Sequence, residues 1–294
     1  SMNGLKGKLI WLTMDNDTSM EYSTMKKIGL ACLLSILVAN GWAHAPFVAP
    51  SSYVVEGGNT AILAGFAEQA FDSEVAIKGF NFKVLTPKGE TQELTLSHSK
   101  ALSLADVKTD HAGTYTVTGL RTGELKYAKV GQRWLRVLDA KAEDLAPLAE
   151  RHFVTPSEVQ AKTQQFTVQR VDQLLSYFSK QQYGAVKQEH AQQGLRLEFS
   201  GHPNQISLKT PFRVKLNLGN KPASGFQVAL EKQATTLGEP EKAIQLQTNG
   251  SGEVTLPFSA VGQYLVTITS PEQSEKIRPN AQIYRTILSL YVNP

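Results

Sequence analysis

The sequence predicts an all-β protein made of two Ig-like or transthyretin-like β-sandwich domains joined by a polar, partly helical connector. Short runs of alternating apolar residues recur between turns rich in Gly, Pro, Asn and Asp, as in sandwich folds. Two of these runs open on a Gly-x-Tyr phrase, at residues 113–115 and 262–264. The stretch between the two sets of runs, residues 140–194, is polar and rich in Gln.

Residues 1–43 have the features of a leader that ends in a secretory signal peptide. A positive start at Met25-Lys26-Lys27 precedes an apolar run and then small residues ahead of His44. The apolar run is about a dozen residues long, against the roughly 20 that span a bilayer. We expect translation to start at Met25, with residues 1–24 as a genuine long n-region of the signal peptide as the alternative, and cleavage to follow Ala43. The product is then a periplasmic protein that does not span the membrane.

The first sandwich is expected at residues 44–139. Phe80, Phe82 and Val84 alternate before a Thr-Pro-Lys-Gly turn, as in a strand that enters a hairpin. The phrase Asp-His-Ala-Gly-Thr-Tyr that ends at Tyr115 is typical of a late strand in Ig-like sandwiches, where the Tyr hydroxyl bonds to nearby backbone. Further strands are expected near residues 53–55, 62–66, 94–96 and 102–104.

The connector is expected at residues 140–194. Residues 140–151 show a helical spacing of apolar positions. Thr155-Pro156-Ser157-Glu158 fits the start of a helix, with a cap residue, Pro at the first position and Glu three residues after the cap. Residues 166–168 and 177–178 fit extended structure equally well, so this stretch stays open between helix and strand.

The second sandwich is expected at residues 195–294. Phe212, Val214, Leu216 and Leu218 alternate cleanly, and a Thr-Asn-Gly-Ser-Gly sequence at 248–252 predicts a hairpin. The Gly-x-Tyr phrase at 262–264 repeats the strand opening of the first domain. Further strands are expected near residues 195–197, 226–230, 244–246, 254–258 and 284–292.

The expected mature chain contains no sulfur. It has 251 residues, which is 294 less the 43 of the leader, and this length suits two small domains. It therefore has no disulfide framework and no soft ligand for Cu(I), so any metal site must use N and O ligands. The cysteine and the methionines all lie in the leader: Cys32, Met2, Met14, Met20 and Met25.

Charge and motifs exclude some function classes. The formal net charge of +4 is modest, and no Lys/Arg run resembles a nucleic-acid-binding patch, so no nucleic-acid partner is expected. The sequence contains no Gly-x-Ser-x-Gly, no His-Glu-x-x-His, no phosphate-binding glycine loop and no Cys pair. We therefore expect a protein that is not an enzyme.

Histidines are the candidate metal ligands. After cleavage, His44 offers a free amine and an imidazole on one residue, which are two nitrogen ligands for a borderline metal ion. His202 is the best partner, because it lies in a turn with Pro203-Asn204 at the start of the second domain. His111, in the turn before Tyr115, is the third candidate. The polar surroundings of the other histidines favour surface roles: His98, His152 and His190.

Several motifs together resemble a large bacterial family of periplasmic proteins of unknown function that are described as periplasmic components of cobalt/nickel uptake systems. The similarity covers nearly the whole expected mature chain. The chain departs from the family pattern at Gln205, where an acid is frequent, and at Phe47, where Trp is frequent. The matching motifs are Ala43-His44 with Pro50-Ser51-Ser52, residues 194–198 with His202-Pro203-Asn204, the turn at 219–225, and residues 249–252 with 261–264.

This resemblance implies a periplasmic β-rich protein that binds a divalent transition metal, Ni or Co, and supports its uptake or delivery with a membrane metal transporter. By position, His44 and His202 match histidines of the family. Cu²⁺ competes at any nitrogen site, because the divalent stability order favours it.

Two other functions stay open. Tandem sandwiches also serve as adhesion or binding modules that present loops to glycans or proteins without a metal. A copper-dependent oxidase with a terminal histidine is a third reading, although its axial Tyr or Phe is not identifiable in the sequence. Binding that is insensitive to a blocked N-terminus would favour the binding module.

Overall fold

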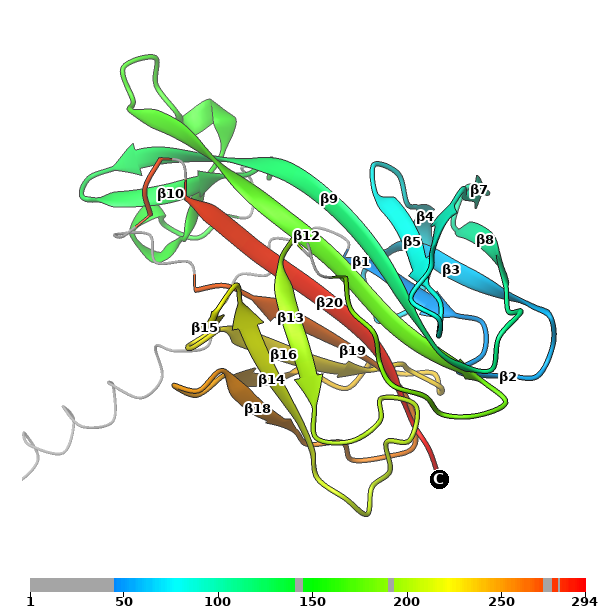
Figure 1. Cartoon of the computed structure of the whole chain (residues 1–294). Coiled ribbons are helices and arrows are strands. Elements are labelled where there is room, and N and C mark those ends of the chain that lie inside the picture. The colour runs from blue at the N-terminus through cyan, green and yellow to red at the C-terminus, as the bar shows by residue number, and fades with distance from the viewer. Residues whose placement is uncertain (1–44, 141–144, 190–192, 272–276, 280) are drawn as a thin grey trace, which may run out of the picture. The chain divides into compact units, whose positions relative to one another are not determined.

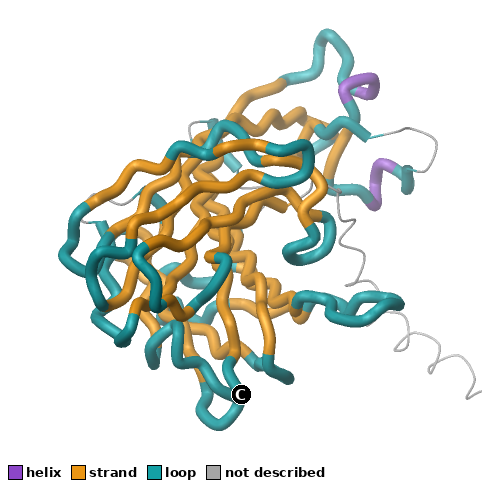
Figure 2. The backbone as a smooth tube through the Cα atoms, turned by 90° about the vertical axis from the view of Figure 1, so that its right-hand side faces the viewer, coloured by secondary structure: helices purple, strands orange, loops and turns teal. Residues whose placement is uncertain are grey.

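The structure is a computed structural model that describes residues 45–140, 145–189, 193–271, 277–279 and 281–294, all within the compact unit Gly41–Pro294. In these residues the chain forms strands and loops, with two 3₁₀ turns, η2 (Leu148–Glu150) and η3 (Pro156–Glu158) (Figure 2). The predicted all-β class is confirmed. In the same ranges, no helix has the length and apolarity to cross a membrane.

The strands form three sheets, called A, B and C. Sheet A has five strands: β1 (Ala45–Pro50), β3 (Asn59–Ala67), β4 (Ser73–Ala76), β7 (Ser97–His98) and β8 (Ser103–Lys108). Sheet C has four: β13 (Leu195–Phe199), β14 (Phe212–Leu218), β15 (Lys221–Pro222) and β18 (Glu253–Leu256). Sheet B has eleven: β2 (Val54–Val55), β5 (Asn81–Leu85), β6 (Thr91–Leu94), β9 (Gly113–Val130), β10 (Arg133–Val137), β11 (Phe153–Val154), β12 (Gln165–Lys180), β16 (Gln227–Lys232), β17 (Ile244–Gln247), β19 (Gly262–Thr269) and β20 (Gln282–Val292).

Three long strands form the centre of sheet B, and Figure 1 shows them running side by side. β12 pairs antiparallel with β9 along its whole length and parallel with β20 on its other side. The parallel pair joins segments about a hundred residues apart in the chain. The first and last thirds of the described chain are therefore held on one sheet.

The two faces of sheet B contribute to two different cores. Leu175 and Tyr177 of β12 belong to the core that sheet B forms with sheet C. Leu174 and Phe178 of the same strand belong to the core that it forms with sheet A. Side chains alternate across a strand, so a strand that is apolar on both faces lies between two apolar layers. The two sandwiches consequently share sheet B.

One end of sheet B has two small hydrophobic cores of its own. This end, called the extension, consists of β10, β11 and the paired segments 123–130 of β9 and 165–170 of β12. One face carries Tyr127, Val168, Ile277 and Ile283. The other face carries a second cluster, which is Ala128, Leu135 and Val154. Neither cluster contains a residue of sheet A or C, so the extension stands apart from both sandwich cores.

Both Gly-x-Tyr phrases form the expected backbone contact. The Tyr115 hydroxyl donates to the His111 carbonyl at 2.8 Å and accepts from the His111 N–H at 3.1 Å. Tyr264 does the same with Ala260, at 2.9 and 3.1 Å. Each hydroxyl thus ties down the turn before its strand, which is the function of a tyrosine corner. The predicted contact of the Tyr115 hydroxyl is confirmed, and Tyr264 makes the same contact at the second phrase.

Gly119 shows why β9 has a glycine in mid-strand. Its register partner on β5 is Phe82, and a Cβ at position 119 would lie 2.6 Å from the Phe82 ring. No real Cβ contact is that short, so any larger residue would displace the ring from the core shared with sheet A. The glycine lets the Phe82 ring approach the backbone of β9 closely.

The connector differs from its expected secondary structure. Residues 165–180, left open between helix and strand, form the 16-residue strand β12. The helix expected at 140–151 is wrong: its described part contains only η2. The capping signal at Thr155 is real, since Glu158 accepts from the Thr155 N–H at 2.9 Å, but it closes the single turn η3. The division into domains 44–139 and 195–294 stays a prediction.

Candidate functional site

The first predicted ligand, His44, lies outside the described residues, as do His190 and the expected signal peptide. The residue after it, Ala45, begins β1, which is paired with β3 from its first residue. β1 is buried from Pro46 onwards, and the Val48 carbonyl accepts a 2.6 Å bond from Ser289 of β20. The segment that directly follows His44 is therefore firmly attached to sheets A and B.

His111 contributes its backbone to the first tyrosine corner, through the two bonds with Tyr115. In the described chain its imidazole makes no hydrogen bond or ion pair. Its role as a metal ligand stays a prediction.

His202 lies in a polar network that joins four parts of the chain. Its Nε2 lies 2.9 Å from the Gly184 carbonyl and 2.9 Å from the Thr114 hydroxyl. Its Nδ1 accepts from the Asn204 N–H at 3.1 Å. Because a carbonyl can only accept, Nε2 carries the proton and Nδ1 is the acceptor, which fixes one neutral tautomer.

Asn204 extends this network into the interior. It is buried, its side-chain oxygen accepts from Ser179 at 2.8 Å, and its amide nitrogen donates to the Tyr177 carbonyl at 2.9 Å. Asn293, which follows β20, donates to the Asn204 carbonyl at 3.1 Å. The His-Pro-Asn motif therefore links β9, β12, the start of sheet C and the C-terminus. A metal ion at either nitrogen of His202 would have to displace one of these bonds.

The His202 network predicts a pH dependence of stability. Burial lowers the pKa of His202, more than the Gly184 bond raises it. The unfolded chain, with a pKa of about 6.5, therefore takes up its proton first. The stabilisation is complete above pH 6.5 and is lost as the pH falls below it. We expect His202→Gln to lower the free energy of unfolding by about 1–3 kcal/mol at pH 7.5 and to flatten its decline towards pH 5.

Urea unfolding at several pH values measures this effect. His152→Gln is the control, because His152 is exposed. A His202→Gln variant whose stability falls with pH as steeply as the wild type would contradict the assignment.

Candidate metal clusters are absent from the described ranges, where no three His, Cys, Asp or Glu residues lie close enough to hold an ion. Within the described ranges, four charged side chains instead lie close together on sheet B. Asp172 of β12 is 1% exposed and lies beside three arginines. Arg121 contacts it through Nη2 at 2.8 Å and Arg285 through Nε at 2.8 Å. Arg170 donates to the carboxylate from Nη2 at 3.4 Å, and its Nε lies 3.1 Å away without hydrogen-bond geometry.

We call Arg121, Arg170 and Arg285 the arginine cluster. The pKa values of Asp172 and Arg170 are both shifted from their ordinary values. Burial disfavours the charge of Asp172, but the arginines, Arg285 foremost, outweigh it and hold the pKa of this carboxyl below its usual value. Burial, together with the like charge of Arg285, lowers the pKa of Arg170 to about 10. The carboxylate is thus fully compensated, whereas the positive charges repel one another.

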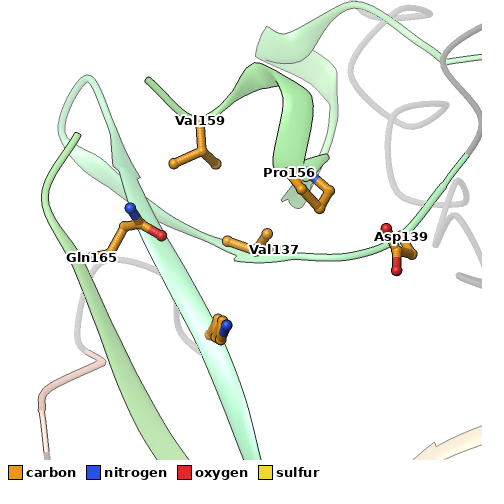
Figure 3. Close-up of a pocket in the computed structure, with 6 residues that line it drawn as sticks. Val137, Asp139, Pro156, Val159 and Gln165 are labelled. Carbon is orange, nitrogen blue, oxygen red and sulfur yellow. The ribbon is translucent and has the colours of Figure 1, made fainter. Parts of the chain in front are cut away.

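A hollow of about 400 Å³ lies on the extension (Figure 3). It is on the face of the small core that contains Val137 and Val159. Its lining combines apolar side chains with one cation, one carboxylate and one amide: Lys126, Val137, Asp139, Pro156, Val159 and Gln165. Ligand pockets usually measure about 300–1,000 Å³ and combine a mostly apolar lining with a few polar groups. The volume of the hollow is within this range, and three of its six lining residues are apolar.

A smaller cavity, of about 130 Å³, lies where residues 188–193 approach β5, β9 and β12. Gln173 lines this cavity and has a structural role, because its side-chain amide forms hydrogen bonds with both the N–H and the carbonyl of Leu195, each at 3.1 Å. This volume is below that of usual ligand pockets. The larger hollow on the extension is therefore the stronger candidate site.

The comparison with known families covers residues 41–271, which match the domain of unknown function DUF4198. This chain belongs to the DUF4198 family. No curated protein matches it.

Among solved structures, the DUF4198 chain is similar to other β proteins at low identity. The D0-D1 domain of intimin is 11% identical, with 84% of this chain and 100% of that chain covered and a TM-score of 0.20. The FN1-FN3 domains of chicken CNTN1 are 8% identical, with 86% and 100% covered and a TM-score of 0.22. Alpha-2-macroglobulin from Escherichia coli is 12% identical, with 88% and 16% covered and a TM-score of 0.22. These likenesses concern the fold alone.

Sequence reasoning missed both the arginine cluster and the hollow of this DUF4198 chain. The arginines are spread over residues 121–285, and only the register of β9, β12 and β20 brings them together. The one local signal was Arg-Val-Asp at 170–172, two opposite charges two residues apart just before the apolar pair Leu174-Leu175.

Proposed function

We propose that this DUF4198 protein is a non-enzymatic binding module of the periplasm. The observation that carries the proposal is the hollow on the extension, with its volume of about 400 Å³ and its mixed lining. Lys126 and Asp139 offer opposite charges at one opening, with Val137 and Val159 beside them. This combination suits a small ligand with both donors and acceptors, such as an amino acid or a sugar.

The location of the hollow supports this proposal. The β9 and β12 segments beneath it are paired residue by residue, and β10 and β11 extend the same sheet. Arg151 and Glu158 form a hydrogen-bonded ion pair in the segment that carries Pro156 and Val159. The pair, with Arg151 foremost, lowers the pKa of Glu158 to about 2. The walls are thus held on a firm platform, as ligand recognition requires.

A ligand-observed NMR screen of amino acids, dipeptides and sugars tests this function. We expect hits with the wild type that disappear in Gln165→Trp, because the indole would fill the opening. Gln169→Trp is the matched control: both glutamines are exposed, on the same strand and on the same face. Absence of hits, or hits that survive in Gln165→Trp, would overturn the proposal.

A second candidate function is the binding of Ni²⁺, Co²⁺ or Cu²⁺ by His44 for a membrane metal transporter. The observation that favours it is the attachment of β1, since a chain cleaved after Ala43 carries its free amine and imidazole directly on a buried strand. A ligand pair on a rigid element loses little entropy when it binds a metal.

Calorimetry on secreted protein tests the metal function. Mass spectrometry first establishes the N-terminal residue. We then expect tight binding by protein that begins at His44 and loss of binding when one extra residue precedes it. His202→Gln should keep the binding if His202 is structural only. Equal binding by both forms, or none by either, would exclude a terminal-histidine site.

A further inference from the structure

The positive charge of the arginine cluster exceeds the negative charge of Asp172. Three guanidinium groups surround one carboxylate, so the four side chains carry a formal charge of +2. Uncompensated charge in a half-buried place is costly, because water no longer screens it. Besides burial, the like charges of Arg285, Arg136 and Arg121 lower the pKa of Arg170. A purely structural ion pair would need one arginine.

The register of sheet B holds these charges in a row. Asp172 is directly opposite Arg121 on β9 and directly opposite Arg285 on β20. Arg170 is two residues before Asp172 on the same strand, so its side chain is on the same face. The guanidinium groups therefore come from three adjacent paired strands, which gives the cluster a fixed geometry before any ligand arrives.

Some hydrogen-bond donors of the arginine cluster are not used by Asp172. In the described chain, the hydrogen bonds of the Arg285 side chain use Nε alone, which leaves both of its terminal nitrogens. Arg121 uses Nε and Nη2, and its guanidinium lies 4.4 Å from the centre of the Phe80 ring. The three side chains are 15–26% exposed, so solvent and small ions can reach them.

We propose that the arginine cluster is a binding site for a tetrahedral dianion, namely a phosphate or sulfate group. Its two negative charges match the excess charge of the cluster. Planar guanidinium groups donate pairs of parallel hydrogen bonds to oxyanions, and arginine serves this purpose better than lysine. Asp172 orients the three arginines and takes no part in holding the anion. The hollow of the proposed function is on the opposite face of sheet B, so the two sites are independent.

Titration with sodium phosphate and sodium sulfate at constant ionic strength, followed by the NMR signals of the arginine Nε–H groups, tests the site. We expect saturable shifts with the wild type, and affinity about 10- to 100-fold weaker in Arg285→Gln. Arg285→Lys keeps the charge and should also bind more weakly, because it lacks the planar fork. Arg196→Gln, an exposed arginine on sheet C, is the control and should bind as the wild type does. Circular dichroism confirms that each variant is folded.

A second arm separates free from lipid-borne phosphate. Sedimentation with phosphatidylglycerol vesicles that depends on Arg285 would assign the site to a headgroup, and saturation by inorganic phosphate alone would assign it to a soluble anion. Two results would overturn the proposal: shifts no larger than those with chloride, or shifts unchanged in Arg285→Gln.

Discussion

Replacing Asp172 with asparagine should lower the free energy of unfolding by about 3–5 kcal/mol, the usual cost of removing one partner from a buried ionic group. The asparagine is nearly the same size, so packing changes little. What changes is charge: Arg121, Arg170 and Arg285 would remain together without their common carboxylate. Urea unfolding at pH 7 and fixed salt measures the difference.

Two comparisons make the Asp172 result specific. Asp106→Asn changes an exposed aspartate on β8 and should alter stability by less than about 0.5 kcal/mol. The double variant Asp172→Asn/Arg170→Gln should regain part of the loss, because it also removes a positive charge. Equal losses in the single and double variants would show that the repulsion between arginines is unimportant.

The second large effect is expected at Phe178, where replacement by alanine should cost about 3–5 kcal/mol. This side chain is fully buried in the core between sheets A and B, and its ring stacks on Tyr115 with 4.8 Å between the centroids. Alanine would leave a cavity in this core near the C-terminal end of β12. The control on the same strand is Thr167→Ala, an exposed position with an expected change below about 0.5 kcal/mol.

The Phe178→Ala variant also tests how the two sandwiches depend on each other. β12, β19 and β20 each carry residues of both main cores. We therefore expect one cooperative unfolding transition, in which amides of sheets A and C lose protection from hydrogen exchange together. Two separate transitions would instead support independent domains at 44–139 and 195–294.

Strand β12 of the connector could not be identified from the apolar pattern of its own sequence. β12 is buried over residues 171–179, yet it includes Asp172, Gln173 and Ser176. These polar groups break the alternation that identifies a strand, because burial of polar side chains requires partners that local sequence does not display. The partners lie on other strands: Gln173 bonds Leu195, and Ser176 bonds Ser289. A central strand stabilised in this way is hard to recognise from its own residues.

The histidine motif illustrates the same limit at the candidate site. His-Pro-Asn forms the predicted turn, in which the Gln205 N–H donates to the His202 carbonyl at 2.9 Å. The partners of His202, Thr114 and Gly184, lie 88 and 18 residues away, so no spacing rule could reveal that both of its nitrogens are hydrogen bonded. The metal roles of His44, His111 and His202 stay predictions.

The sequence by itself determined the all-β class, most strand positions and both tyrosine corners, because alternation, turn residues and contacts four residues apart are local properties. Tertiary structure alone decided that the two sandwiches share sheet B and that Arg121, Asp172 and Arg285 lie in one row. The reason is physical. Strand pairing joins residues 51 and 113 positions apart, and the register is set by packing of two cores at once.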